Sequence, residues 1–108
     1  MSPKRGDVYL IDRTPAAGSE VEKLRPCVLV GATPINHARR TVLVVPLSGS
    51  GTPRPPLAVE VECLGRTAVA LCDQLRAVDK GRLREPAGAL TADDLGQIEE
   101  ALRHILSL

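Results

Sequence analysis

Two polar residues stand where apolar runs of the sequence meet loops. Arg25 precedes Pro26 and opens the run CVLV, and Ser48 closes the run TVLVVPL. A guanidinium is always cationic and presents a planar fork of donors, so an arginine beside a hydroxyl is suited to holding a phosphate. On the residues alone, a surface arginine and a turn serine remain the more ordinary interpretation.

Both runs predict strands that would bring this pair together. Pro26 lacks an N–H and belongs at a strand start or a sheet edge, which favours a strand over 25–31. The stretch 41–48 is the most apolar and is expected to be the central strand. If the two strands pair antiparallel, the start of one lies beside the end of the other. Arg25 and Ser48 would then share one rim, bordered by loop 13–23 and by 49–56, which we interpret as a mobile loop.

Three further stretches have the composition or alternation of short strands, and we expect these at 6–12, 57–62 and 67–72. The segment 73–83 is expected to hold a strand end and a tight turn, with a last short strand in EPAGAL. The segment 33–40 is expected to be a connection, with one helical turn as an open option. The order predicts a mainly β domain, a small, strongly bent antiparallel sheet or partly open barrel that carries one helix.

The helix is expected at the C-terminal end of the chain. Thr91 is placed to cap it, with Asp94 in the capping-box position. Spacings of i, i+3, i+7 and i+10 put its apolar residues on one face, and they are Leu95, Ile98, Leu102 and Ile105. Glu99 and Arg103 are expected to pair on the exposed side.

The composition limits the number of domains and indicates which kinds of partner the chain can bind. The chain has 108 residues and fits one domain, 1–108, with 44% hydrophobic residues but one Tyr and no Phe or Trp. The core is therefore aliphatic, and the aromatic platforms typical of single-strand nucleic-acid binders are missing. Net charge is +1, but residues 1–56 hold 8 Lys and Arg against 4 Asp and Glu, so an anionic partner would meet this half more readily.

Cysteines and histidines give little sign of a metal or nucleophilic site. Cys27, Cys63 and Cys72 are odd in number and form no CxxC pair, which indicates a reducing cytoplasm. Cys27 and Cys72 stand inside apolar runs and are expected to be small hydrophobic residues. No apolar run is long enough for a membrane span. His104 is expected on the helix surface near Glu100, and His37, in a connection, is the open candidate for acid–base chemistry.

The segments RGDVYLID, GSEVEKLRPCVLV, VLVVPLS, DQLRAVDKGRL and EEALRHILSL together resemble the MazF/PemK family of toxin endoribonucleases, in order and over nearly the whole chain. The resemblance implies an SH3-like antiparallel barrel of the plasmid-maintenance toxin type. It also implies a cytoplasmic homodimer that cleaves single-stranded RNA at short sequence motifs without a metal or other cofactor. A cognate, MazE-like antitoxin protein would block the RNA groove.

The resemblance also implies roles for individual residues. Arg25 stands where the family has its catalytic arginine, Ser48 where many relatives have threonine, and Glu20 matches a loop carboxylate implicated in catalysis in some members. Positions implied to contact RNA are Ser19, Gln74, Asn36, Arg76 and Lys80. Arg76 and Lys80 are equally compatible with structural ion pairs.

The implied chemistry uses the 2′-OH of RNA as the nucleophile and yields a 2′,3′-cyclic phosphate and a 5′-OH. Arg25 suits charge stabilisation and Glu20 suits the base, while water and His37 are both open as the acid. The alternative on the same fold is a non-enzymatic toxin that poisons DNA gyrase through Ser107 and Leu108. A non-catalytic RNA-binding barrel is disfavoured by the scarcity of aromatic residues and the near-zero net charge.

Overall fold

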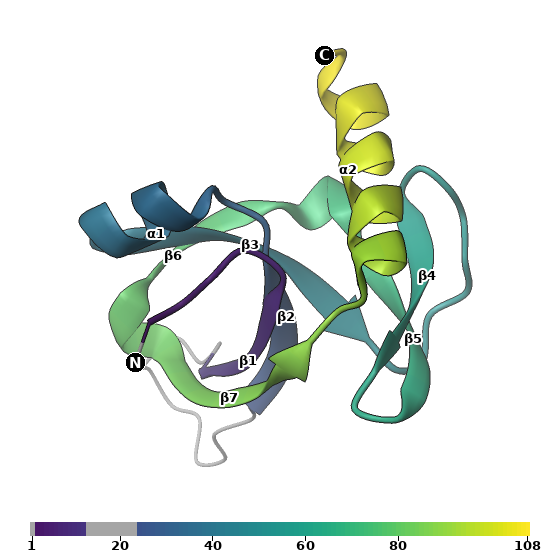
Figure 1. The fold of residues 1–108 in the computed structure, drawn as a ribbon. Helices are drawn as coiled ribbons and strands as arrows, with labels where there is room; N and C mark the ends of the chain where they lie inside the picture. Colours follow the sequence, from purple (N-terminus) through teal and green to yellow (C-terminus); the bar gives the residue numbers. More distant parts are fainter. Residues whose placement is uncertain (1, 13–23) are drawn as a thin grey trace, which may run out of the picture.

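The computed structural model describes residues 2–12 and 24–108 (Figure 1). In these residues seven strands form one antiparallel sheet, and a long C-terminal helix stands against it. The elements in chain order are β1 (Asp7–Asp12), β2 (Leu24–Leu29), α1 (Thr33–Ala38), β3 (Thr41–Ser48), β4 (Ala58–Cys63), β5 (Arg66–Leu71), the 3₁₀ turn η1 (Cys72–Gln74), β6 (Arg76–Asp79), the 3₁₀ turn η2 (Lys80–Arg82), β7 (Leu83–Ala89) and α2 (Ala92–Leu106).

Strand β3 is the centre of the sheet, as its apolar sequence predicts. One edge pairs with β2, and the other pairs first with β6, through Thr41–Val44, and then with β5, through Leu47 and Ser48. The strand order is β4-β5-β3-β2-β1-β7, with β6 joined to β3 beside that path. The sheet therefore curls, and Figure 1 shows β1, β2, β3, β6 and β7 bending around a common interior.

Each face of the curled sheet has its own aliphatic core. Cys27 and Val44 face the interior of the curl, together with Tyr9 and Leu29. Their neighbours point to the other face, because side chains alternate along a strand. That second face is covered by α2 and by β4 and β5, and its core contains Val28, Val45, Leu47, Val61, Ile98 and Ala101. Burial on both faces explains why β3 reads as a nearly continuous apolar run.

Helix α2 begins as the sequence predicts. The Thr91 hydroxyl accepts a hydrogen bond from the Asp94 N–H at 3.1 Å, so Thr91 is the N-cap. The Asp94 carboxylate accepts instead from the Glu62 N–H of β4 at 2.9 Å, which ties the helix start to the sheet. Ile98 is fully buried, and the predicted apolar face is the one that packs.

Two details of the helix surface differ from expectation. The predicted Glu99–Arg103 pair is wrong: Glu99 pairs with Arg5 at 2.6 Å, and Arg103 approaches Glu100 at 3.9 Å. The reason is that Arg5 brings a closer partner from the N-terminal segment. His104 lies on the surface beside Glu100 at 3.6 Å, as expected.

Within 33–40, Thr33–Ala38 form the six-residue helix α1. The segment 73–83 holds the four-residue strand β6 between two 3₁₀ turns rather than one strand end. The segment 49–56 is tied to the start of β4, since the Arg54 N–H donates to the Ala58 carbonyl at 2.7 Å and Arg54 bridges Ala58. Neither described helix is long and apolar enough to cross a membrane.

Candidate active site

The register of β2 and β3 brings Arg25 and Ser48 to one end of the strand pair. The observed partners are Cys27 with Pro46, Val28 with Val45, and Leu29 with Val44. Continuing the same antiparallel register by two residues sets Arg25 opposite Ser48, on the face that also carries Cys27. Arg25 is exposed and Ser48 is half-buried. The antiparallel pairing expected for these strands is confirmed. Arg25 and Ser48 lie at the edge of the core inside the curled sheet, which contains Cys27 and Val44.

A tight turn holds the Ser48 hydroxyl. The Ser50 N–H donates to Ser48 Oγ at 3.3 Å, and the two hydroxyl oxygens lie 3.5 Å apart. The backbone then passes so close to β5 that a Cβ on Gly51 would overlap Val69 Cγ2. Val69 is itself the β5 partner of Ser48. In this turn Ser48 Oγ accepts a hydrogen bond from the Ser50 N–H, and the Ser48 O–H can still donate to another group.

Gln74 and Arg76 border the same rim from the other edge of β3. Because β5 pairs with Ser48 and β6 with Val44, the connection η1 that joins them runs beside the last residues of β3, and both side chains are exposed. Arg76 lies opposite Val44, on the face of Cys27. Burial raises the pKa of Cys27 to about 12, and a Tyr9 backbone hydrogen bond and the positive charge of Arg76 oppose the rise. Arg76 is thus within electrostatic reach of Cys27 in β2, the strand that carries Arg25.

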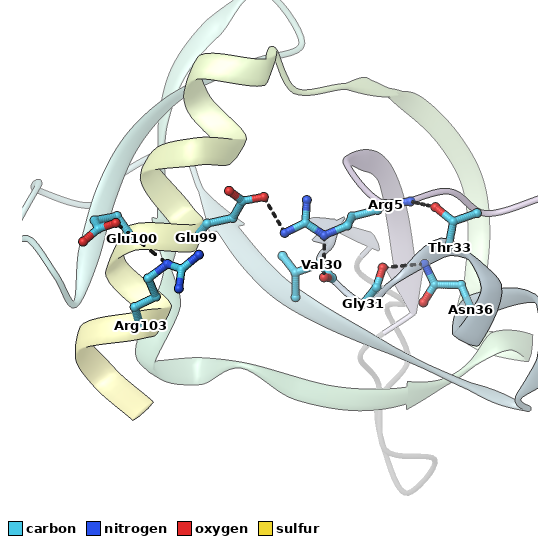
Figure 2. Close-up of polar contacts among 8 residues, drawn as sticks. All are labelled: Arg5, Val30, Gly31, Thr33, Asn36, Glu99, Glu100 and Arg103. Carbon is cyan, nitrogen blue, oxygen red and sulfur yellow. Dashed lines mark hydrogen bonds and ion pairs between the residues drawn. The ribbon is translucent and has the colours of Figure 1, made fainter. Parts of the chain in front are cut away.

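Asn36 and Lys80 have structural contacts at the opposite end of the strand pair. Asn36 is only 1% exposed, and its Nδ2 donates to the Gly31 carbonyl at 3.0 Å (Figure 2). Lys80 Nζ donates to the His37 carbonyl at 3.1 Å. His37 is part of α1, which joins the end of β2 to the start of β3. The fold therefore sets His37 apart from the end where Arg25 and Ser48 lie.

Glu20 and Ser19, the two predicted loop residues, lie outside the described residues. The strands that flank them do bear on the site. Asp12 pairs with Leu24, and Ile11 pairs with Arg25, so the segment 13–23 leaves β1 and enters β2 one residue pair away from Arg25.

The three cysteines are free and buried, as the apolar context of Cys27 and Cys72 predicts for those two. Burial raises the pKa of Cys72 to about 11, with Asp73 adding to the rise, and it also raises the pKa of Cys63. Thiols with pKa values this high hold little thiolate near neutral pH, so they pack as small hydrophobic groups. In residues 2–12 and 24–108, no three His, Cys, Asp or Glu side chains are grouped to hold a metal ion.

Arg5 is a structural residue that the sequence did not identify. Its backbone N–H donates to Thr33 Oγ1 at 3.0 Å, its Nε donates to the Val30 carbonyl at 3.2 Å, and its guanidinium pairs with Glu99. Figure 2 shows how Arg5 thereby links the end of β2, the start of α1 and the middle of α2. Glu99 lies 94 residues away along the chain, so local patterns do not reveal the pair.

Beside Arg5 lies an apolar groove between α2 and the outer face of β2 and β3. It has a volume of about 410 Å³ and is lined by Arg5, Val30, Leu43, Leu75, Glu99, Leu102, Arg103, Leu106 and Leu108. Leu43, Leu106 and Leu108 are 43%, 49% and 83% exposed. The C-terminal residues therefore remain uncovered within one copy of the chain.

Comparison with known proteins agrees with this architecture. Residues 4–106 match the family model described as PemK-like, MazF-like toxin of type II toxin-antitoxin system. A MazE-MazF complex from Deinococcus radiodurans matches with a TM-score of 0.85 and 25% identity, over 100% of this chain and 98% of the other.

Two proteins described as from a Mycobacterial species match as well. An endoribonuclease has a TM-score of 0.82 and 22% identity, over 100% of this chain and 94% of that one. An endoribonuclease in complex with its cognate antitoxin has a TM-score of 0.81 and 24% identity, over 98% and 96% of the two chains. The family match spans almost the whole sequence, and the barrel with its C-terminal helix is shared. This chain therefore belongs to the PemK-like, MazF-like family of type II toxins.

Proposed function

We propose that the protein is the toxin of a toxin–antitoxin pair and cleaves single-stranded RNA at specific short sequences. The observation that carries the proposal is the antiparallel register of β2 and β3, which when continued sets Arg25 opposite Ser48, in a chain of this toxin family. Several structural matches are endoribonucleases or MazF toxins, which supports the same activity. An enzyme acting on messenger RNA would work in the cytoplasm.

We propose that the reaction is transesterification within the RNA, with no metal. The 2′-oxygen attacks the adjacent phosphorus and the bond to the 5′-oxygen breaks, leaving a 2′,3′-cyclic phosphate and a 5′-OH. Arg25 is cationic at every physiological pH and stabilises the charge that builds on the phosphorane. The Ser48 hydroxyl donates to a phosphate oxygen and orients the group that reacts.

Two proton transfers complete the mechanism. Glu20, carried by the segment that enters β2 next to Arg25, is our candidate to take the 2′ proton. The 5′-oxygen must gain a proton when it leaves. Because His37 belongs to α1 at the other end of β2 and β3, we assign this proton to water rather than to His37. Gln74, Arg76 and Ser19 are proposed RNA contacts around the rim, whereas the burial of Asn36 favours a structural role.

Cleavage of a single-stranded transcript in EDTA tests the reaction. We expect fragments that end in a 2′,3′-cyclic phosphate, and no cleavage where the 2′-OH at the cut site is replaced by hydrogen. Intact RNA across varied sequences contradicts the proposed activity. Cleavage that requires added metal contradicts the mechanism alone. Toxicity that survives Arg25→Ala but is lost on removal of Ser107 and Leu108 would instead support poisoning of a protein target.

We also propose that two copies associate through the groove beside α2. Exposed leucines gathered in a groove with a charged rim are typical of a protein interface, and Leu43 and Leu106 lie on both of its sides. Sedimentation of the Leu43→Asp/Leu106→Asp variant should give a monomer where the unmodified chain gives a dimer. Leu64→Asp is the matched control, because Leu64 is 59% exposed in the β4–β5 turn.

The proposed protein partner is a MazE-like antitoxin. Complexes of MazE with MazF and of an endoribonuclease with its cognate antitoxin are among the structural matches. An acidic, flexible segment would suit the cationic rim and compete with RNA. Adding the product of the neighbouring upstream gene should stop cleavage, and undiminished cleavage at saturating amounts would refute that pairing.

A further inference from the structure

A group of cationic side chains runs from the end of α1 across η2 to the start of β7. We call it the basic strip and define it as Arg39, Arg40, Lys80, Arg82 and Arg84. Two hydrogen bonds join its halves: the Lys80 N–H donates to the Arg40 carbonyl at 2.8 Å, and Lys80 Nζ donates to the His37 carbonyl at 3.1 Å. Residues about 40 positions apart thus form one continuous surface.

The strip carries more positive charge than its neighbours neutralise. Three carboxylates lie in or directly beside the segments that form it, against five cationic side chains, and they are Asp12, Asp79 and Glu85. Asp12 pairs with Arg84 at 2.9 Å, and Asp79 Oδ1 accepts from the Gly81 N–H at 2.7 Å. Arg39, Arg40 and Arg82 are exposed, and within the described parts of the chain none of the three forms an ion pair. The positive charges of all three can therefore meet an external anion, although one guanidinium N–H of Arg82 donates to the Asp12 carbonyl.

The strip ends beside the candidate active site. Arg82 donates from its guanidinium to the Asp12 carbonyl at 3.0 Å, at the last residue of β1. Asp12 pairs with Leu24, and the preceding pair is Ile11 with Arg25. In Figure 1 the same course runs from α1 past β6 to the start of β7, next to the end of β1. Arg40 precedes the first residue of β3, and Ser48 is its last residue. At about 3.3 Å per residue, β3 spans roughly 23 Å between its first and last residues.

The chemistry of the strip favours a polyanion over a protein surface. The exposed large apolar side chains of the described residues are Leu24, Ile35, Leu43, Leu57, Leu64, Leu106 and Leu108, and none falls within 38–40 or 79–84. Protein interfaces bury apolar anchors at their centres. Phosphate contacts need only cations at intervals along a surface.

We propose that the basic strip is a sequence-independent subsite for the phosphate backbone of single-stranded RNA outside the cleaved motif. The proposal rests on the RNA-cleaving function proposed above and adds a second place of contact. A long RNA would reach from the candidate active site at Arg25 and Ser48 to Arg39 and Arg40, and a very short RNA would not. The strip would therefore raise affinity for long RNA without altering which bond is cut.

Binding of 2′-O-methyl oligonucleotides, which lack the attacking hydroxyl, tests the proposal by fluorescence anisotropy at several salt concentrations. Lengths of about 4 and about 16 nucleotides bracket the usual site sizes of single-strand grooves. Each lost phosphate contact lowers the salt slope by about 0.7, so for the longer oligonucleotide Arg39→Ala/Arg40→Ala should lower it by about 1.4 and the affinity about 25-fold near 0.1 M salt. The short oligonucleotide should bind the variant and the unmodified chain equally.

Matched variants separate charge from fold. Arg39→Lys/Arg40→Lys should keep the slope, and Arg66→Ala, on an exposed arginine at the β4–β5 hairpin, should leave it unchanged. Unchanged slope and affinity in Arg39→Ala/Arg40→Ala overturn the subsite, while cleavage of short RNA by the same protein keeps the proposed function intact. If that variant instead binds RNA normally but escapes inhibition by the antitoxin, the strip is a protein site and the inference is refuted.

Discussion

Replacing Gly51 by alanine tests whether the turn after β3 positions the Ser48 hydroxyl. The new Cβ would lie closer to Val69 Cγ2 than real Cβ atoms come to other atoms, and Val69 is the β5 partner of Ser48. The turn or β5 must therefore move. Overpacking of this kind costs about 1–3 kcal/mol of stability. A displacement on the order of 1 Å at a catalytic group costs about 10²-fold in rate.

The assay is the initial rate of RNA cleavage, measured together with the free energy of unfolding in urea. Gly51→Ala should lose about 10²-fold in kcat at temperatures where it is fully folded. Gly49→Ala is the matched control, because a Cβ on Gly49 meets nothing within 4 Å. The double variant Gly51→Ala/Val69→Ala removes the Val69 methyl groups that the new Cβ would meet, so it should recover part of the lost kcat and stability. The coupling free energy between the two substitutions should be about 0.5–3 kcal/mol. Full activity in Gly51→Ala would refute the positioning role of the turn.

Other perturbations address stability. Thr91→Ala removes the hydroxyl that caps α2 and should lower the free energy of unfolding by about 1 kcal/mol in urea titrations, whereas Ala92→Ser next to it should change little. Ile98→Ala removes a fully buried side chain between α2 and the sheet and should cost about 2–5 kcal/mol by the same measurement. Folding raises the pKa of Cys27 from 9.0 to about 12, so the unfolded chain loses this proton first as pH rises, and stability should fall above about pH 9 by up to about 1.4 kcal/mol per pH unit. Cys27→Ala should flatten this slope, and an unchanged slope would contradict the buried thiol's contribution.

Much of the fold is predictable because burial leaves a local signature. β3 is apolar at nearly every position, since both of its faces are covered over most of its length, and this marks it as central. Thr91 marks the start of α2 because a side-chain oxygen is needed where the first helical N–H groups lack partners. The antiparallel pairing of β2 with β3 was predictable for consecutive strands, and it puts Arg25 and Ser48 at the same end of the strand pair.

Other parts depend on contacts between distant residues. β6 has only four residues and one buried side chain, Val78, so its alternation is too short to predict a strand. Arg5 and Glu99 meet only in the folded chain. Asn36 looks like a polar connection residue, yet the fold buries it against Gly31, where its Oδ1 has no partner among the described residues.

The basic strip illustrates the same limit for surfaces. A formal net charge of +1 over the whole chain gives no sign of it. Arg39 and Arg40 belong to one segment and Lys80 and Arg82 to another, and only the pairing of β3 with β6 sets them side by side. The clustering of these cationic side chains therefore depends on how the strands pair and not on the composition of the chain.

The central claim is that Arg25 stabilises the transition state of RNA cleavage. Its most direct test is the single-turnover rate of the folded Arg25→Ala variant on a single-stranded transcript in EDTA, with Arg66→Ala as the matched control. We predict a loss of about 10²–10³-fold for Arg25→Ala, with unchanged fragment ends in any residual product, and the unmodified rate for Arg66→Ala. A rate for Arg25→Ala within a factor of about two of the unmodified chain would contradict the account, because the rim that it shares with Ser48 would then not be the active site.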